Sequence, residues 1–288
     1  MNTTLSVLMS IYDRADAAHL RQSLNSLAGQ SVPANELVLV EDGPLNRELA
    51  DVIESFRAEL RIRSVKLPTN AGLGAALRAG LMECRGQFVA RMDGDDVCVH
   101  QRFEKQLAYL STHPYIDVLG SAIAEFDDEL NAPNSTRMLP AGGEELAGFA
   151  RYRNPLNHMT VMFRKASVLG AGSYLPCQGY EDYYLWARML MRGCRFHNLG
   201  DTLVWVRGGI GMQGRRGGLD YIRHEISAQR MLRALGFLTL REFLRNILIR
   251  VPVRLIPGGF RALFYRMILR QRLGGAAIPP SLSHHLRG

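Results

Sequence analysis

The sequence predicts an α/β fold, because stretches typical of buried strands alternate with stretches of helical spacing up to residue 112. The expected strands are 5–11, 36–42, 62–67 and 87–93, and the expected helices are 17–30, 46–59, 73–84 and 101–112. This alternation is typical of parallel β-α-β units with right-handed crossovers. Ligands bind such sheets beyond the carboxyl ends of the strands, so the residues that follow each strand are the first candidates for a site.

The regular alternation is lost after residue 115, although further elements are expected. Strands are predicted at 117–127, 158–165 and 202–207, a helix at 181–192, a polar loop at 131–145 and a mobile, glycine- and arginine-rich loop at 207–218. These changes divide the chain into residues 1–115, residues 116–239 and a tail, 240–288.

Composition is that of a globular protein in a reducing compartment. At 288 residues with 47% hydrophobic residues the chain can bury a large core. Its four cysteines stand far apart without a C-x-x-C pair, so neither a zinc knuckle nor a disulfide framework is indicated. The N-terminus lacks a basic region before its short apolar run, and nowhere do 18 uncharged apolar residues follow one another. We therefore expect a cytoplasmic protein.

The positive charge is concentrated in the tail. Residues 240–288 contain nine arginines and one acidic residue, Glu242, an excess equal to the net charge of +8 of the whole chain. Because residues 1–239 are balanced, a nucleic-acid partner is not expected.

The tail also has an amphipathic pattern. Apolar residues fall on one helical face, and the pattern returns after a break at 257–259: Phe243, Leu244, Ile247, Leu248 and Val251, then Phe260, Leu263, Phe264, Met267 and Ile268. Basic amphipathic helices of this kind can lie in an anionic membrane interface. The alternative is two helices that pack on the rest of the protein with their arginines in water.

Three carboxylates stand at the end of the strand predicted at 87–93: Asp93 is its last residue, and Asp95 and Asp96 follow it. Carboxylates held this close raise one another's pKa unless a cation joins them. Mg²⁺ and Mn²⁺ commonly take one or two carboxylates together with phosphate oxygens, so a metal that bridges the protein and a diphosphate fits this spacing. The alternative is a solvated acidic turn that caps the next helix.

Two further segments follow strands. In "VEDG" (40–43) Glu41 or Asp42 can accept hydrogen bonds from a base or ribose, unless the segment is simply a turn allowed by Gly43. The segment "NAGLGAALRAG" (70–80) lacks the G-x-G-x-x-G spacing and follows the third strand, which disfavours a Rossmann dehydrogenase.

Taken in order, these motifs resemble glycosyltransferase family 2 over about residues 4–235, and in particular the bacterial exopolysaccharide and lipopolysaccharide enzymes of the amylovoran type. The resemblance is carried by "SVLMSIYDR", "SLNSLAGQSVPANELVLVEDG", "NAGLGAALRAGL", "GQFVARMDGDD" with the following Arg102 and Phe103, and "GYEDYYLWARMLMRG". It implies a GT-A fold, Rossmann-like with a mostly parallel central sheet, to which the amphipathic helical tail is attached. It also implies a nucleotide-diphosphate sugar donor, a divalent cation, Mn²⁺ or Mg²⁺, and inversion at the anomeric carbon.

The resemblance further implies roles for individual residues. Residues 1–115 would bind the nucleotide sugar, through Ser10, Tyr12, Asp42, Asn70, Gly72 and Asp93. Asp93, Asp95 and Asp96 would hold the metal and the ribose. Residues 116–239 would bind the acceptor, with Asp182 as the general base and Glu181, Trp186 and Arg188 around it. An inverting transfer needs such a base for the acceptor hydroxyl. By residue chemistry alone, the alternative is that Glu181 and Asp182 only complement the dipole of the helix that they open.

Three other candidates come from residue chemistry. His158 can reach the acceptor site or help to neutralise the diphosphate, although a histidine beside a strand is commonly structural. Arg215 and Arg216 can close over a diphosphate, because guanidinium groups match phosphate oxygens, or belong to a solvated basic loop.

The sequence thus predicts a glycosyltransferase that moves a sugar from a nucleotide donor, by resemblance a UDP-sugar, to a growing, lipid-linked bacterial glycan at the inner face of the cell membrane. A sugar-phosphate nucleotidyltransferase would normally carry a glycine- and arginine-rich phosphate loop after the first strand, where this chain has "SIYDRAD". A catalytically silent membrane adaptor of a glycan-synthesis complex remains the alternative from another class.

Overall fold

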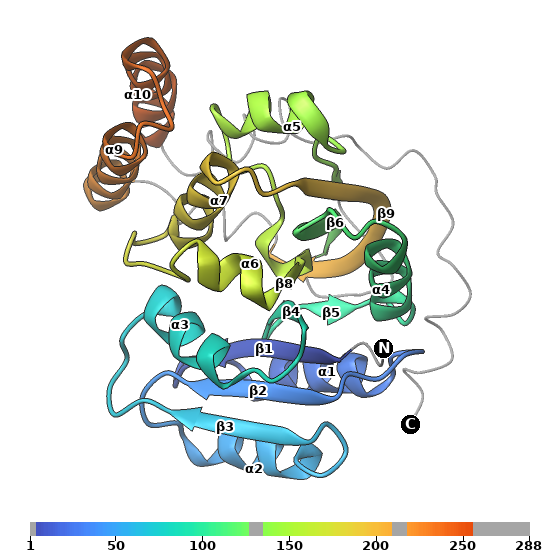
Figure 1. Ribbon diagram of the computed structural model, residues 1–288. Helices are drawn as coiled ribbons and strands as arrows, with labels where there is room; N and C mark the ends of the chain where they lie inside the picture. The colour runs from blue at the N-terminus through green and yellow to red at the C-terminus, as the bar shows by residue number, and fades with distance from the viewer. Residues whose placement is uncertain (1–3, 127–134, 209–217, 256–288) are drawn as a thin grey trace.

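The computed structural model describes residues 4–126, 135–208 and 218–255, which form one nine-stranded sheet with helices on both faces (Figure 1). The strand order is β3-β2-β1-β4-β8-β6-β9-β5, and β7 pairs with β6. The strands are β1 (Leu5–Ile11), β2 (Glu36–Glu41), β3 (Ile62–Lys66), β4 (Phe88–Asp93), β5 (Val97–Cys98), β6 (Val118–Phe126), β7 (Ser135–Arg137), β8 (Met162–Arg164) and β9 (Phe196–Arg207).

The first four strands in this order are parallel, as the alternating sequence pattern predicts. Helices cover both of their faces, so their side chains are apolar in both directions. On β1, Val7 and Met9 join the core beneath α1 (Ala17–Ala28) and α2 (Arg47–Phe56), whereas Leu8 joins the core beneath α3 (Leu73–Glu83). The predicted Rossmann-like half is confirmed.

The second half of the sheet is mixed. β8 is antiparallel to β4 and to β6, and β9 is parallel to β6 but antiparallel to the short β5. The helices of this half are α4 (Arg102–Thr112), α5 (Gly143–Ala150), the 3₁₀ helix η1 (His158–Thr160), α6 (Lys165–Gly170) and α7 (Glu181–Met191). α6 and α7 lie on the same side of the sheet as α3, as Figure 1 shows.

Two last helices, α9 (Leu219–Ala234) and α10 (Leu240–Leu255), stand as a pair beside α7 (Figure 1). An apolar cluster that includes Leu232 and Phe237 packs against Tyr183 and Ala187 of α7. α10 begins with a capping box, because the Thr239 hydroxyl accepts from the amide of Glu242 and the Glu242 carboxylate accepts from the amide of Thr239. The first helix expected in the tail is therefore present.

Several elements depart from the sequence-based expectation. The stretch 158–165, predicted as one strand, is η1 followed by the short β8, and the part of the predicted loop 131–145 that is described contains β7 and the start of α5. β5, α6 and α9 were not predicted. β5 and α6 are short, and neither α6 nor α9 has a side-chain N-cap, so the local sequence signal of all three is weak.

Among residues 4–126, 135–208 and 218–255, no helix has both the length and the apolar composition needed to cross a membrane. The break at 257–259, the second apolar pattern of the tail and most of the loop 207–218 lie outside the described residues.

Candidate active site

The candidate site lies at the carboxyl ends of β1, β2 and β4. Ser10 is directly opposite Asp93 in the parallel register of β1 and β4, and the amide of Asp42 donates to the carbonyl of Ile11 at 2.8 Å. The sheet therefore brings together three segments that are far apart in the sequence, at the edge where a ligand is expected.

Asp42 fixes the loop that precedes α3. Its two carboxylate oxygens accept from the amides of Ala71 and Gly72 at 2.7 and 3.1 Å, and Asp42 is only 5% exposed. Gly72 has a φ of +86°, a left-handed conformation that glycine adopts without strain. Tyr12 and Asn70 are exposed beside this loop. The motifs "VEDG" and "NAG" are thus one structural unit, with polar side chains on its open side.

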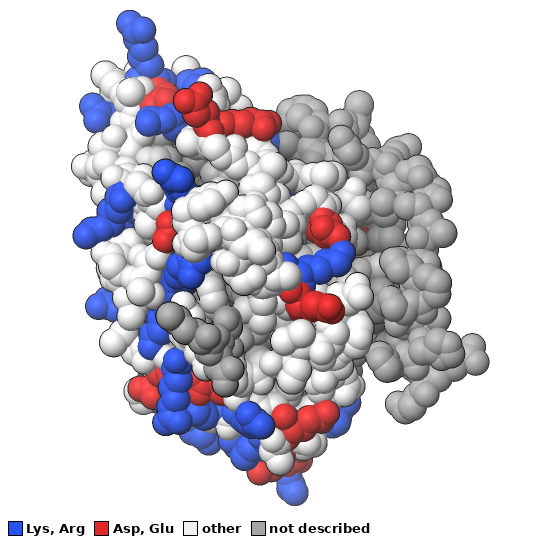
Figure 2. Space-filling view, turned by 45° about the vertical axis from the view of Figure 1, so that its right-hand side comes forward, with Lys and Arg blue, Asp and Glu red and all other residues white. Residues whose placement is uncertain are grey.

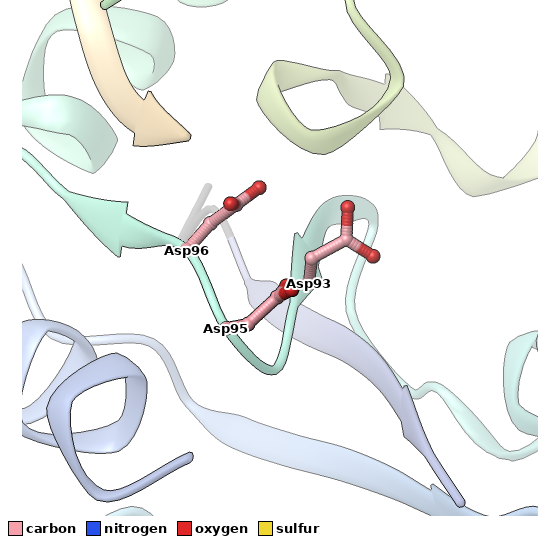
Figure 3. A group of neighbouring side chains, drawn as sticks. All are labelled: Asp93, Asp95 and Asp96. Carbon is pink, nitrogen blue, oxygen red and sulfur yellow. The ribbon is translucent and has the colours of Figure 1, made fainter. Parts of the chain in front are cut away.

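Asp93, Asp95 and Asp96 rise from the tight turn between β4 and β5 (Figure 3). One carboxylate oxygen from each lies within 4.8 Å of the others. Asp96 is buried, and burial together with the charges of Asp93 and Asp95 raises its pKa well above the ordinary value. Its Oδ1 accepts from the amide of Arg207 at 3.0 Å, whereas its Oδ2 has no hydrogen-bond donor among the described residues. A buried oxygen without a donor, in a set of oxygen ligands, fits Mg²⁺ or Mn²⁺.

Arg91 pairs with Asp93 from inside the sheet. The two residues point to the same face of β4, and the two terminal guanidinium nitrogens meet the two carboxylate oxygens of Asp93. Burial alone would lower the pKa of Arg91, but the charge and hydrogen bond of Asp93 outweigh it and the pKa is raised. A permanent positive charge therefore lies beneath the acidic turn.

Asp182, the expected general base, is the second residue of α7. The amide group of Asn154 donates to its Oδ2 at 2.5 Å, and the amide of Tyr183 donates to its Oδ1 at 2.7 Å. Burial raises its pKa in spite of these two bonds and the charge of Arg91. A partly desolvated carboxylate, oriented by two donors, can accept a proton from a hydroxyl group.

His158 is part of an aromatic group with Tyr174 and with Trp186 of α7. Its Nε2 is 3.0 Å from the hydroxyl of Tyr174, and its ring meets Trp186 edge to face at 6.1 Å. Burial and the charge of Arg91 lower the pKa of His158 well below the ordinary value, which keeps the imidazole neutral. Trp186 is fully buried in this group.

Glu181 and Arg188 lie on α7 with Asp182, and each contacts a neighbouring segment of the chain. A Cβ at Gly74 of α3 would lie 2.6 Å from Cγ of Glu181, so α3 and α7 approach closely at this point. Arg188 is 8% exposed and donates to the carbonyls of Ala171 and Ser173 at 2.5 and 2.6 Å. Its guanidinium thus braces the segment before Tyr174.

Three residues near the site were missed in the sequence: Arg91, Asn154 and Arg207. Arg91 had a visible signal, a charged residue inside an otherwise apolar strand. Asn154 and Arg207 had none, because their contacts to Asp182 and Asp96 span 28 and 111 residues. Arg215 and Arg216 lie outside the described residues.

Comparison with known proteins agrees with this geometry. Residues 6–171 match the family model described as glycosyl transferase family 2. The chain is 41% identical over 252 residues to the amylovoran biosynthesis glycosyltransferase AmsE of Erwinia amylovora, which covers 88% of this chain and 94% of that protein. It is 34% identical over 268 residues to an Escherichia coli protein named UDP-Gal:alpha-D-GlcNAc-diphosphoundecaprenol beta-1,3-galactosyltransferase, which covers 93% of this chain and 97% of that one.

A solved structure shares the fold. The mannosyltransferase PcManGT from Pyrobaculum calidifontis, in complex with GDP-Man and Mn2+, matches with a TM-score of 0.59 over 97% of this chain and 77% of that chain, at 15% identity. The predicted GT-A fold is thereby confirmed.

Proposed function

Because the chain belongs to glycosyl transferase family 2 and is a glycosyltransferase, we propose that it transfers a sugar, with inversion, from a UDP-sugar to a lipid-linked bacterial glycan. The observation that carries this proposal is the pairing of two carboxylate sites, the acidic turn at Asp93 to Asp96 and the oriented Asp182, with Arg91 as the nearby cation of both.

The acidic turn is proposed as the donor site. Asp93, Asp95 and Asp96 would hold Mn²⁺ or Mg²⁺, which when bound neutralises charge on the departing diphosphate. Ser10, Tyr12, Asp42, Asn70 and Gly72 would surround the nucleoside. The UDP donor is supported by the name of the Escherichia coli relative, and a divalent cation by the Mn2+ complex of the mannosyltransferase with the same fold.

Asp182 is proposed as the base for the acceptor. It takes the proton of the acceptor hydroxyl while that oxygen attacks the anomeric carbon opposite the diphosphate. The new carbon–oxygen bond forms as the bond to the diphosphate oxygen breaks, so the configuration inverts. The neutral His158 can only help by hydrogen bonding, because its lowered pKa keeps it uncharged at neutral pH. Glu181, Trp186 and Arg188 shape the pocket by packing.

The acceptor is proposed to lie at the inner face of the cell membrane. A lipid-linked acceptor is supported by the relative whose name contains a diphosphoundecaprenol substrate. The arginine-rich segment 240–288, apart from Arg250, which pairs with buried Glu225, is the proposed contact to an anionic membrane surface.

A transfer assay tests the proposal and its alternatives. The purified protein is incubated with radiolabelled UDP-sugars, Mn²⁺ and a short diphospholipid acceptor, and both products are analysed. Labelled glycolipid and free UDP support transfer. A silent adaptor would give neither product. A nucleotidyltransferase would instead release pyrophosphate in a parallel incubation with UTP and a sugar phosphate.

A further inference from the structure

Helix α10 packs on the protein through polar side chains and exposes a row of leucines to solvent. Leu240, Leu244 and Leu248 are 57%, 49% and 73% exposed, and they are spaced four residues apart, so they form one row on the helix surface. Asn246, in contrast, is 2% exposed. The single apolar face expected from the sequence is therefore split in two. Phe243 and Ile247 are half-buried against the protein, whereas Leu244 and Leu248 face solvent.

A buried polar network fixes the helix in this rotation. Arg250 of α10 pairs with Glu225 of α9 at 2.6 Å, and the Glu225 side chain is fully buried. Asn246 donates to the side-chain oxygen of Gln229 at 3.1 Å and to the carbonyl of Arg151 at 2.9 Å. If the helix turned its leucines inward, a buried charge and buried amides would lose their partners. The free energy lost would exceed the free energy gained by burying a few leucines.

The network also connects α10 to the acceptor side of the site. Arg250 donates to the carbonyl of Tyr152 at 2.5 Å, two residues before Asn154, which orients Asp182. Glu225 accepts from the hydroxyl of Tyr180 at 2.6 Å, two residues before Asp182. The direction in which the leucine row faces is thus fixed relative to Asp182.

We propose that the row Leu240, Leu244 and Leu248 is a membrane-binding surface that inserts into the interface of an anionic bilayer and holds the acceptor side of the site against it. The proposal rests on the proposed function, which puts the acceptor on a lipid. The charge around the row favours an anionic bilayer as the binding partner. Exposed Arg241 flanks the row on the same helix, and the only acidic residue of 240–288, Glu242, is engaged in the capping box. A row of leucines beside an exposed arginine suits insertion below phosphate headgroups. Figure 2 shows that lysine and arginine side chains also gather along one edge of the visible face.

Sedimentation with sucrose-loaded vesicles tests the surface. The full chain, the triple variant Leu240→Gln/Leu244→Gln/Leu248→Gln and the control Met82→Gln/Met138→Gln are compared. Met82 and Met138 are 61% and 59% exposed but lie outside α10, so the control removes comparable exposed apolar surface elsewhere. Vesicles contain phosphatidylglycerol with phosphatidylcholine, or phosphatidylcholine alone. UDP binding by calorimetry is measured for every protein.

The expected result is that the full chain and the control bind the phosphatidylglycerol vesicles, that both bind phosphatidylcholine alone weakly, and that the triple variant binds at least about tenfold less. Equal binding by the triple variant would overturn the proposal. A dimer of the full chain in light scattering that the triple variant loses, without vesicle binding, would overturn it in favour of a second copy. Unchanged UDP binding in these cases would show that the proposed donor site survives the failure of the membrane surface.

Discussion

Arg91 and Asp93, two residues apart on β4, form an ion pair in which both terminal guanidinium nitrogens meet both carboxylate oxygens. The arginine side chain is 3% exposed and the aspartate side chain 29%, so the pair joins the core of the sheet to the open acidic turn. Arg91 thereby fixes the direction of Asp93 before any ligand arrives, and it supplies one positive charge to a turn with three carboxylates.

Replacement of Arg91 should make the stability of the protein depend on metal. In Arg91→Met the Asp93 carboxylate loses its partner beside Asp95 and Asp96, and we expect a loss of about 1–3 kcal/mol in the free energy of unfolding without metal. Mn²⁺ should raise the melting temperature of this variant more than that of the wild type, because a bound cation replaces part of the lost charge. Equal Mn²⁺-induced shifts in the two proteins would show that Arg91 and the cation do not share a site.

Asp182→Asn should abolish turnover while donor binding persists. The amide keeps the shape of the carboxylate but cannot take the acceptor proton, so kcat should fall by about 10²–10⁴-fold. The matched control is Glu181→Gln, a neighbouring amide substitution on α7, which should retain most of the activity. A similar loss in both variants would show that the charge at the start of the helix matters rather than a base at Asp182.

Asn154→Ala should move the pH dependence of transfer. The Asn154 amide favours the ionised form of Asp182, so its removal should raise the pKa of Asp182 further above its already raised value. A base acts in its ionised form, so the acidic limb of the kcat/KM profile should shift to higher pH and the rate below it should fall. Asn25→Ala, on the exposed face of α1, should leave the profile unchanged. A lower rate without displacement of the limb would show that Asn154 orients Asp182 but does not set its pKa.

The pair between Glu225 and Arg250 should be costly to break from either side. Glu225→Gln and Arg250→Met each leave one buried charge without its partner, and we expect each to lower the free energy of unfolding by about 3 kcal/mol. The double variant should lose much less than the sum, which a double-mutant cycle in urea measures. Additive losses would mean that the two side chains do not stabilise each other, and that this pair does not fix the rotation of α10.

The parallel half of the sheet was predictable because its signals are local. Strands such as "LSVLMSI" are buried on both faces and their flanking helices show clear apolar spacing, so chain order and the rules for crossovers suffice. The same rules made the residues at the strand ends, Asp42 and Asp93 among them, the first candidates for a site.

The second half was less predictable because long-range contacts decide it. β5 consists of two residues that form a strand only by pairing with Val204 and Trp205 of β9. The orientation of α10 could not be predicted either. Its sequence alone suggested that Phe243, Leu244 and Leu248 share one face, whereas Phe243 is half-buried and the two leucines are exposed. The polar partners in α9 and at Arg151, which determine its rotation, are invisible to helical periodicity.

The acidic turn is proposed to bind a nucleotide diphosphate together with a divalent cation. The most direct measurement is calorimetric titration with UDP and with GDP, each with and without Mn²⁺, of the wild type and of Asp93→Asn/Asp95→Asn. We expect that UDP binds in the presence of Mn²⁺, that binding weakens strongly without the metal, and that the double variant loses it. Binding of UDP that ignores both the metal and the two aspartates would contradict the claim, as would the absence of binding by either nucleotide.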